Sequence, residues 1–393
     1  MRQIYFDHSA TTPLDPRVVE AMLPFYGETF GNPSSLHWAG QQAKQAIDTG
    51  RGQLAKLFHA EPDEMVFTAS GTEADNMALV GVATQYQPAD CHIITSAFEH
   101  PAILETCKYL HGLGYPISYL PVSTDGIVEP ASLGQAFQPN TRLVSVMAAN
   151  NVVGTLQPIG ELAQMAAERG VLFHTDAVQA AGKVPFDMRS MPISMLSLSA
   201  HKLHGPKGIG ALYIRQGVKL EPLVHGGGQE RGVRSATENV AGIAGLGKAA
   251  EIAAAEMTEE AVRLVQLRDR LIDEVTRQIP NAYLIGHAFR RLPGHICLGF
   301  AGQEGEAIHL MLALNEEGIA ISTGSACSAH HAGQPSYILM AMGMDPVRAR
   351  GSLRITLGRY NTDEEVDVLL AVLPRLVSSL HPVTSHNFAT IPQ

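Results

Sequence analysis

The sequence is poor in several residues whose abundance would mark particular classes of protein. Among its 393 residues there are only four cysteines and one tryptophan. The cysteines form no CxxC pair and have no spacing typical of a zinc finger, which argues against a structural zinc site or a disulfide framework. We therefore predict no metal site and mostly reduced thiols, at Cys91, Cys107, Cys297 and Cys327.

Excess basic charge and long apolar runs are also lacking. The chain has 28 basic and 38 acidic residues, and a net charge of −10 argues against binding to nucleic acid. No uninterrupted apolar run approaches the roughly 20 residues that a membrane-spanning helix needs. Asp7 and His8 come too early for the hydrophobic region of a signal peptide. These features predict a cytoplasmic protein that binds neither nucleic acid nor membranes.

Short apolar runs alternate with helical patterns through the first 250 residues. Strands that are buried on both faces read as continuous apolar runs, and their alternation with helices predicts a mainly parallel α/β sheet. The Gly-rich segments match neither GxxxxGK[ST] nor GxGxxG, which argues against a nucleotide-binding fold. The expected strands are 64–69, 92–97, 142–150, 171–177, 194–200 and 210–215, and the expected helices are 72–85, 101–113 and 159–169.

The pattern changes near residue 250. A long helical stretch is followed by shorter apolar runs, which predicts a second and smaller α/β domain. We expect a large domain of residues 15–250 and a small domain of residues 1–14 and 251–393, the latter carrying a loop at about 321–335. The elements behind this division are a helix at 237–279, strands at 295–300 and 352–358, and helices near 303–317 and 362–379.

The strongest local signal for chemistry is the segment 197–210, "SLSAHKLHGPKGIG". It places Lys202 directly after a buried strand and before a Gly/Pro-rich turn. A partly desolvated lysine amine there is a nucleophile for a carbonyl group. The ordinary alternative is a solvated loop lysine, and Lys207 is an obvious rival for the role.

Two further segments follow predicted strands. Asp176 in "HTDAVQAAG" comes at the carboxyl end of a strand, where ligands of α/β proteins bind, although an Asp there can also serve as an N-cap. In "TASGTEADN", Gly71 and Thr72 open a helix whose free N–H groups can bind an anion. This second signal is weak alone, because Gly-Thr-Glu is also an ordinary start of a helix.

Three more side chains are candidates. His100 follows a strand and can stack on a planar ring or shuttle protons, although a structural role is common for such a histidine. Arg354 has a planar fork that suits a carboxylate, and its alternative is a surface charge. Cys327 lies in "ISTGSACSAHHAG", where small residues predict a mobile loop and an exposed thiol. The neighbouring His330 and His331 could lower the thiol pKa or bind a metal, or they are solvated loop residues.

The combination and order of these segments resemble the cysteine desulfurases of the class V aminotransferase family. The motifs that carry the resemblance run from "IYFDHSATTP" at 4–13 to "LGRYNTDEEVD" at 357–367. The cysteine segment is similar to that of the long-loop group, which serves iron–sulfur assembly. One departure is Val152, since the family commonly has Asn-Asn-Glu where this chain has Asn-Asn-Val. The resemblance implies the aspartate aminotransferase-like fold of pyridoxal 5'-phosphate (PLP) enzymes.

The resemblance also implies a role for each candidate residue. Lys202 would carry PLP, Asp176 would hold its pyridine nitrogen protonated, and His100 would stack on its ring. Arg354 would bind the α-carboxylate of cysteine, and Cys327 would take the substrate sulfur as a persulfide. The remaining implied cofactor contacts are Gln179 at the phenolic oxygen, Asn151 beside cofactor and substrate, and Gly71, Thr72, Ser199, His201 and, from a second subunit, Thr237 at the phosphate.

The function implied is conversion of L-cysteine to L-alanine, with sulfur delivered to an iron–sulfur scaffold or another acceptor protein. The contribution of Thr237 from a second subunit implies a homodimer. A selenocysteine lyase, a C–S lyase that releases pyruvate, and an aminotransferase remain as alternatives that keep PLP. A partner-binding platform without activity is a further alternative, but such proteins are expected to lose Lys202 or Asp176, and both are present.

Overall fold

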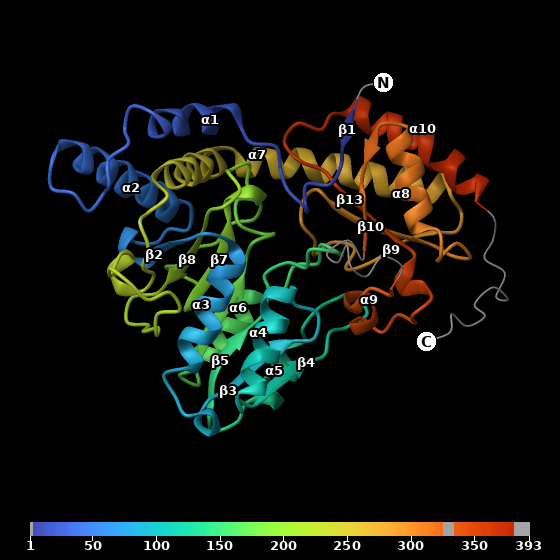
Figure 1. Ribbon diagram of the computed structural model, residues 1–393. Coiled ribbons are helices and arrows are strands. Elements are labelled where there is room, and N and C mark those ends of the chain that lie inside the picture. The colour runs from blue at the N-terminus through green and yellow to red at the C-terminus, as the bar shows by residue number, and fades with distance from the viewer. Residues whose placement is uncertain (1–2, 325–333, 381–393) are drawn as a thin grey trace, which may run out of the picture.

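The larger part of the molecule is built on a seven-stranded sheet (Figure 1). The computed structural model describes residues 3–324 and 334–380. The strand order is β2-β8-β7-β6-β5-β3-β4, and every pairing is parallel except those of β8 with β2 and β7. The strands are β2 (Met65–Thr68), β3 (His92–Ser96), β4 (Ile117–Leu120), β5 (Thr141–Ser145), β6 (Leu172–Asp176), β7 (Met195–Ser199) and β8 (Gly210–Ile214).

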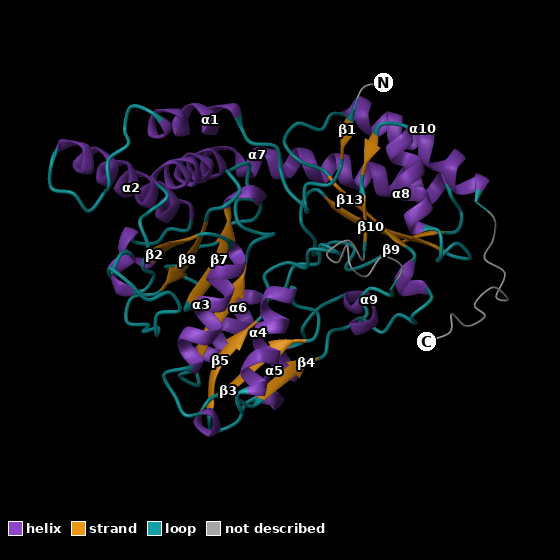
Figure 2. Cartoon of the chain, viewed as in Figure 1, coloured by secondary structure: helices purple, strands orange, loops and turns teal. Residues whose placement is uncertain are grey.

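Helices cover both faces of this sheet (Figure 2). Successive residues of a strand point to opposite faces, so both faces need apolar side chains. Leu143 of β5 belongs to the same buried core as Leu110, whereas the next residue, Val144, belongs to the core that contains Leu162. The helices of this part are α1 (Pro16–Met22), α2 (Trp38–Leu57), α3 (Gly71–Ala83), α4 (Pro101–Gly112), α5 (Pro130–Ala136) and α6 (Ile159–Ala167).

The smaller part has an antiparallel sheet of order β12-β13-β10-β9 and its own apolar core. A short parallel pair, β1 with β11, lies beside it. The strands are β1 (Ile4–Tyr5), β9 (Ala282–Leu284), β10 (His295–Phe300), β11 (Ile319–Ala320), β12 (Ser322–Thr323) and β13 (Ser352–Thr356). The helices are α8 (Ala307–Glu316), α9 (Tyr337–Ala341) and α10 (Asp363–Ser379).

One long helix, α7 (Val240–Gln278), joins the two parts. Its first half contributes Leu246 and Ala250 to the core of the larger part, and its second half contributes Leu267 and Leu271 to the core of the smaller part. The predicted domain boundary at residue 250 therefore falls inside a continuous helix. That boundary stays a prediction.

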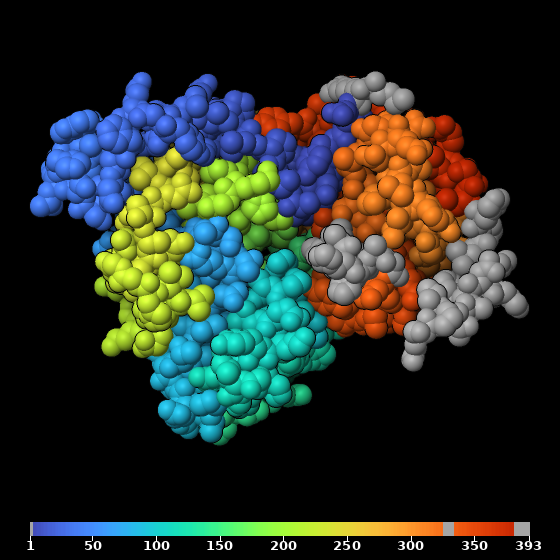
Figure 3. All heavy atoms as spheres, in the orientation of Figure 1, coloured from blue at the N-terminus to red at the C-terminus, as the bar shows by residue number. Residues whose placement is uncertain are grey.

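The N-terminal segment connects both parts and lies between them on the face shown in Figure 3. Asp7 forms a bridge with Thr356 at the end of β13, and Phe6 is fully buried. Five residues later, the Thr12 N–H donates to the carbonyl oxygen of His201, 2.9 Å away. The segment thereby brings the backbone of Ser9 and Ala10 next to the loop that contains Lys202.

The strands and helices predicted from apolar runs are present, with ends shifted by a few residues. Among the elements that the sequence patterns do not predict are α2 and β4. Helix α2 contains three glycines, which weaken a helix in isolation. Gly50 is needed for packing, because a Cβ there would lie 2.8 Å from the carbonyl oxygen of Ile243 on α7. Strand β4 is a half-exposed edge strand with one buried residue, Leu120.

Cys91, Cys107 and Cys297 are all buried, as is typical of cysteines that serve in packing. Burial raises the pKa of Cys91 and Cys297 to about 11 and that of Cys107 to about 12. A thiol with such a pKa is a poor nucleophile at neutral pH. Within residues 3–324 and 334–380, no helix is long and apolar enough to cross a membrane.

Candidate active site

A cavity of about 410 Å³ opens at the carboxyl ends of β6 and β7, beside the first turns of α3 and α4. The carboxyl ends of parallel strands lie at the same edge of a sheet, which is where α/β proteins bind ligands. Thr237 does not line this cavity, and Cys327 lies outside the described residues. The cavity is lined by all the other predicted site residues: Gly71, Thr72, His100, Asn151, Asp176, Gln179, Ser199, His201, Lys202 and Arg354.

Lys202 ends a short 3₁₀ helix that follows β7 directly. Its Nζ donates to the carbonyl oxygens of Ser9 and Ala10, the latter 2.8 Å away. These acceptors come from the N-terminal segment, so the amine is held at the boundary between the two parts of the molecule. The rival lysine, Lys207, is exposed and does not line the cavity.

Asp176 and His100 form the electrostatic centre of the cavity. Asp176 is the last residue of β6, and its Oδ1 accepts from the Val178 N–H at 2.8 Å. Burial raises the pKa of Asp176, although the adjacent His100 opposes this effect. Burial lowers the pKa of His100, whose Nδ1 accepts from the Ala102 N–H at 3.1 Å. A buried carboxyl group with few hydrogen-bond donors around it is suited to bind a cationic group of a ligand.

The start of α3 forms a recess for an anionic group. Ser70 is the N-cap, and the first helical residues, Gly71 and Thr72, border the cavity. A Cβ at Gly71 would lie 2.6 Å from Cγ2 of Val178 and 3.4 Å from Cβ of Ser199. Free N–H groups at a helix N-terminus favour phosphate, and a residue without a side chain lets it approach.

Arg354 lies at the centre of the smaller part's sheet and is only 2% exposed. The alternative prediction of a surface charge is wrong, because β13 is flanked by β12 and β10 and is buried along its length. Nη2 of Arg354 pairs with Oδ1 of Asp7 at 2.8 Å, and Nη1 donates to the Asn151 carbonyl oxygen at 3.0 Å. Its Nε is buried and has no hydrogen-bond partner among the described residues.

Asp75 is a cavity residue that the sequence analysis does not identify. It is buried on α3, with its Oδ1 3.7 Å from Nε2 of His174. Burial and the nearby Asp176 raise the pKa of Asp75 well above its usual value, while burial lowers the pKa of His174 to about 3. The helix α3 is apolar on most sides, so its sequence pattern does not show which polar residue faces the cavity.

Val152, the departure from the family pattern, is buried beside the point where the cysteine segment begins. Its Cγ1 lies 3.3 Å from the position of a Cβ on Gly324, and its carbonyl oxygen accepts from Nε2 of His295 at 2.9 Å. An apolar residue therefore packs next to Gly324 at this position. Among the described residues, no cluster of three or more His, Cys, Asp and Glu side chains is arranged to hold a metal ion.

Comparison with known proteins decides the family. Residues 4–369 match the family described as aminotransferase class-V. The chain belongs to the class V aminotransferases. This class V aminotransferase is 48% identical to cysteine desulfurase IscS of Dictyoglomus turgidum, over 98% of this chain and 97% of the relative. It is also 48% identical to cysteine desulfurase IscS of Methanosarcina thermophila, over 99% and 96% of the two chains.

Solved structures confirm the predicted fold of this class V aminotransferase. A NifS-like protein superposes with a TM-score of 0.90 at 40% identity, over 96% of this chain and 100% of that one. SspA in complex with cysteine superposes with a TM-score of 0.81 at 34% identity, over 91% and 100% of the two chains. The mainly parallel large sheet with a smaller α/β part is thus the aspartate aminotransferase-like fold.

PLP is the cofactor of these enzymes, and the cavity of this class V aminotransferase fits it. The recess at Gly71 suits the phosphate, and the buried Asp176 carboxyl suits the pyridine nitrogen. Oε1 of Gln179 is buried without a hydrogen-bond partner among the described residues, although its Nε2 donates to the Ser9 carbonyl oxygen at 2.9 Å. A buried polar atom without a partner costs about 1–3 kcal/mol, which a donor or bridging group of a ligand would offset.

Gly71→Ala tests the phosphate recess. We expect the variant to fold but to bind PLP roughly ten- to a hundredfold more weakly, because the new Cβ meets Val178 and closes the approach to the first turn of α3. PLP affinity is measured by absorbance titration of the protein freed of cofactor. Gly52→Ala is the matched control, since a Cβ on this helical glycine would have no other atom within 4 Å. Equal PLP affinity in both variants would contradict a phosphate site at Gly71.

Proposed function

We propose that this chain is a cysteine desulfurase that converts L-cysteine to L-alanine and takes the sulfur on Cys327. The observation that carries the proposal is one cavity lined by Lys202, Asp176 and Arg354, an amine, a carboxyl and a guanidinium from three separate segments. A PLP enzyme acting on an amino acid needs these three groups together. Relatives named cysteine desulfurase match the chain over nearly its full length, which supports this choice of reaction.

Bound PLP would withdraw electrons from the Cα atom of the amino acid. In this proposal, Asp176 keeps the pyridine nitrogen protonated, which requires its carboxyl group to be ionised against the effect of burial. The ring nitrogen's positive charge provides the opposing attraction. Lys202 moves the proton from Cα, since its amine lies beside the cavity at the end of β7.

The remaining cavity residues hold the cofactor and substrate. His100 stacks on the ring, Gln179 contacts the phenolic oxygen, and Asn151 contacts both cofactor and substrate. The phosphate is held by Gly71, Thr72, Ser199 and His201. These assignments follow the family resemblance and agree with the place of each residue on the cavity wall.

Sulfur transfer is assigned to Cys327, which lies outside the described residues. Its thiolate forms an S–S bond with the substrate sulfur as the Cβ–S bond breaks, and the enzyme is left with a persulfide. Cys91, Cys107 and Cys297 are poor alternatives because each is buried and has a raised pKa. The segment that contains Cys327 begins after Gly324, next to β12, whose Ser322 lines the cavity.

A homodimer is part of the proposal. Thr237 is exposed and does not line the cavity of its own chain, as expected if it completes the phosphate site of the partner. The segment before α2 projects from the molecule (Figure 1), and large apolar side chains are exposed along it and at the start of α2. Phe30 is 73% exposed, Leu36 92% and Trp38 64%, and such a group is typical of a surface covered by another protein.

We also propose a cytoplasmic enzyme whose persulfide passes to an acceptor protein such as an iron–sulfur scaffold, without a nucleic-acid partner. Selenocysteine lyase and C–S lyase activities are the alternatives. Product analysis of the holoenzyme with L-cysteine and a thiol reductant tests the proposal. We expect alanine and sulfide in equal amounts. Pyruvate and ammonia in place of alanine would indicate a lyase, and activity confined to selenocysteine would indicate the selenium enzyme.

Arg354→Lys tests substrate binding. Lysine keeps the positive charge but loses the fork that can bind a carboxylate in a bidentate manner, so we expect KM for cysteine to rise about tenfold or more. The change in kcat should be smaller, because Arg354 does not take part in proton transfer. Steady-state kinetics provide both values. Arg348→Lys, at an exposed arginine, is the control and should leave KM unchanged.

A further inference from the structure

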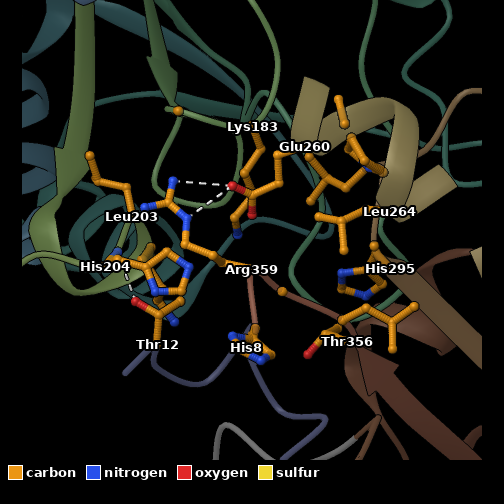
Figure 4. Close-up of a pocket in the computed structure, with 18 of the residues that line it drawn as sticks. His8, Thr12, Lys183, Leu203, His204, Glu260, Leu264, His295, Thr356 and Arg359 are labelled. Atoms are coloured by element: carbon orange, nitrogen blue, oxygen red, sulfur yellow. Dashed lines mark hydrogen bonds and ion pairs between the residues drawn. The ribbon is translucent and has the colours of Figure 1, made fainter. Parts of the chain in front are cut away.

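A second cavity shares Ser9 and Lys202 with the candidate active site but is otherwise lined by different residues (Figure 4). Its walls come from the middle of α7, the N-terminal segment, the segments 182–183 and 202–204, the residues just before β10 and those just after β13. It therefore lies where the two parts of the molecule meet. Neither the proposed chemistry nor the predicted cofactor contacts require it.

Lys183 provides an amine at this cavity without a counter-ion among the described residues. Nζ of Lys183 makes no hydrogen bond or ion pair with any of them, although it lines the cavity. The only described carboxylate in the lining is that of Glu260, whose Oε2 accepts from Nε and Nη2 of Arg359, each at 3.1 Å. Arg359 is further neutralised by Asp15 at 2.7 Å.

The electrostatic balance of the cavity is consequently positive. Burial lowers the pKa of Lys183 to about 7, and the positive charges of Lys202 and Arg354 act in the same direction, while Glu260 opposes them. Burial of an ammonium group without a counter-ion is costly, and the charge is retained only when an anion lies next to it. An anion in the cavity would supply that partner.

Size and shape limit which anion fits. The space open to the centre of a water molecule is about 50 Å³. One water needs roughly 10–15 Å³ on this measure, so there is room for about three to five non-hydrogen atoms. The lining also includes the apolar side chains of Met257, Leu264 and Leu292. A short aliphatic carboxylate has this number of atoms and this division into a charged and an apolar end.

We propose that this cavity binds a small monocarboxylate of the size of acetate or propionate, with its carboxylate on the Lys183 ammonium and its hydrocarbon end against Leu264 and Met257. The site is separate from the proposed catalytic function and does not depend on it. The ligand contributes only charge and shape, so no covalent step is involved.

Binding at this site should depend on pH in a defined direction. A bound carboxylate raises the pKa of Lys183, because it stabilises the protonated amine. The affinity for the carboxylate is therefore highest where Lys183 is already protonated, and it falls as the pH rises. With a pKa of about 7, the protonated fraction falls about tenfold between pH 6 and pH 8. The charge of Arg354 acts on Lys183 from outside the cavity lining. The other titratable and charged groups of the lining are Lys202, Glu260, Arg359, His8, His204 and His295.

Burial disfavours the charged forms of the three histidines. It lowers the pKa of His8 to about 3, that of His295 well below its usual value, and that of His204 as well. Lys183 and Lys202 are the two amines in the described lining, and variants of Lys183 separate their contributions.

Calorimetric titration of the holoenzyme with sodium propionate at pH 6 and pH 8, at constant ionic strength, tests the proposal. We expect the wild type to bind about tenfold more weakly at pH 8. Lys183→Met should lose binding at least tenfold at pH 6, and Lys183→Arg should bind with little difference between the two pH values. Lys207→Met, at an exposed lysine, is the control and should behave as the wild type.

The variant Arg354→Lys distinguishes propionate bound at the candidate active site from propionate bound at the second cavity. Binding at the candidate active site would weaken in Arg354→Lys and persist in Lys183→Met, the reverse of the result expected here. Equal propionate affinity in the wild type and Lys183→Met would overturn the proposal. If Lys183→Met does not fold, Lys183→Arg decides alone, and a wild-type pH dependence in that variant would contradict the assignment to Lys183.

Discussion

Lys202→Ala should lose the visible absorption band of the bound cofactor together with its activity. In the proposed mechanism, loss of this amine leaves PLP without its covalent attachment and Cα without a proton acceptor at the end of β7. Removing a nucleophile and general base together is expected to lower kcat by roughly a thousandfold or more. Borohydride reduction followed by mass spectrometry measures the attachment, and sulfide release from cysteine measures the activity.

Lys207→Ala is the matched control for this variant. Lys207 lies in the same loop, five residues later, but it is exposed and outside the cavity. It should retain the absorption band and full activity. A Lys202→Ala protein that still fixes PLP after borohydride reduction would show that another lysine is the attachment site.

Cys327→Ser should retain the cofactor and its absorption band but release no sulfide above a background roughly a thousandfold below the wild type. Serine keeps the approximate size of the side chain and removes the thiol that we propose as the nucleophile toward the substrate sulfur. Spectra recorded after addition of cysteine test whether the substrate still reaches the cofactor, and a sulfide assay measures turnover.

Ser328→Ala is the control, because it changes the adjacent residue and leaves the thiol in place. It should form sulfide at a rate close to that of the wild type. Full activity of Cys327→Ser would assign sulfur transfer to another group or to direct release. The buried Cys297, in β10, is not expected to substitute for it, since its pKa is raised to about 11.

Much of the fold could be predicted from the sequence because the parallel strands are buried on both faces. Strands such as β6 and β7 begin with large apolar residues, are almost completely buried, and end in polar residues. Asp176 ends β6 and the segment that contains Lys202 follows β7, so the parallel pairing of these two strands places them side by side. Their position on one cavity follows from topology as well as from family resemblance.

Other features depend on tertiary contacts that periodicity does not show. The burial of Arg354 follows from the position of β13 inside a four-stranded sheet, which a single charged residue in a short strand does not indicate. Asp75 lies on a helix with apolar residues on most sides, so its orientation toward Asp176 could not be derived from spacing. The second cavity forms only where α7 and segments that are far apart in the sequence, such as 202–204 and 292–295, meet near Lys183.

Mass spectrometry of the wild-type holoenzyme after treatment with L-cysteine, without reductant, tests directly whether sulfur is transferred to Cys327. We expect a gain of one sulfur atom, mapped to the peptide that contains Cys327 and removed by dithiothreitol, with one alanine formed for each persulfide. A protein that converts cysteine without gaining sulfur, or that gains it on Cys91, Cys107 or Cys297, would contradict sulfur transfer to Cys327.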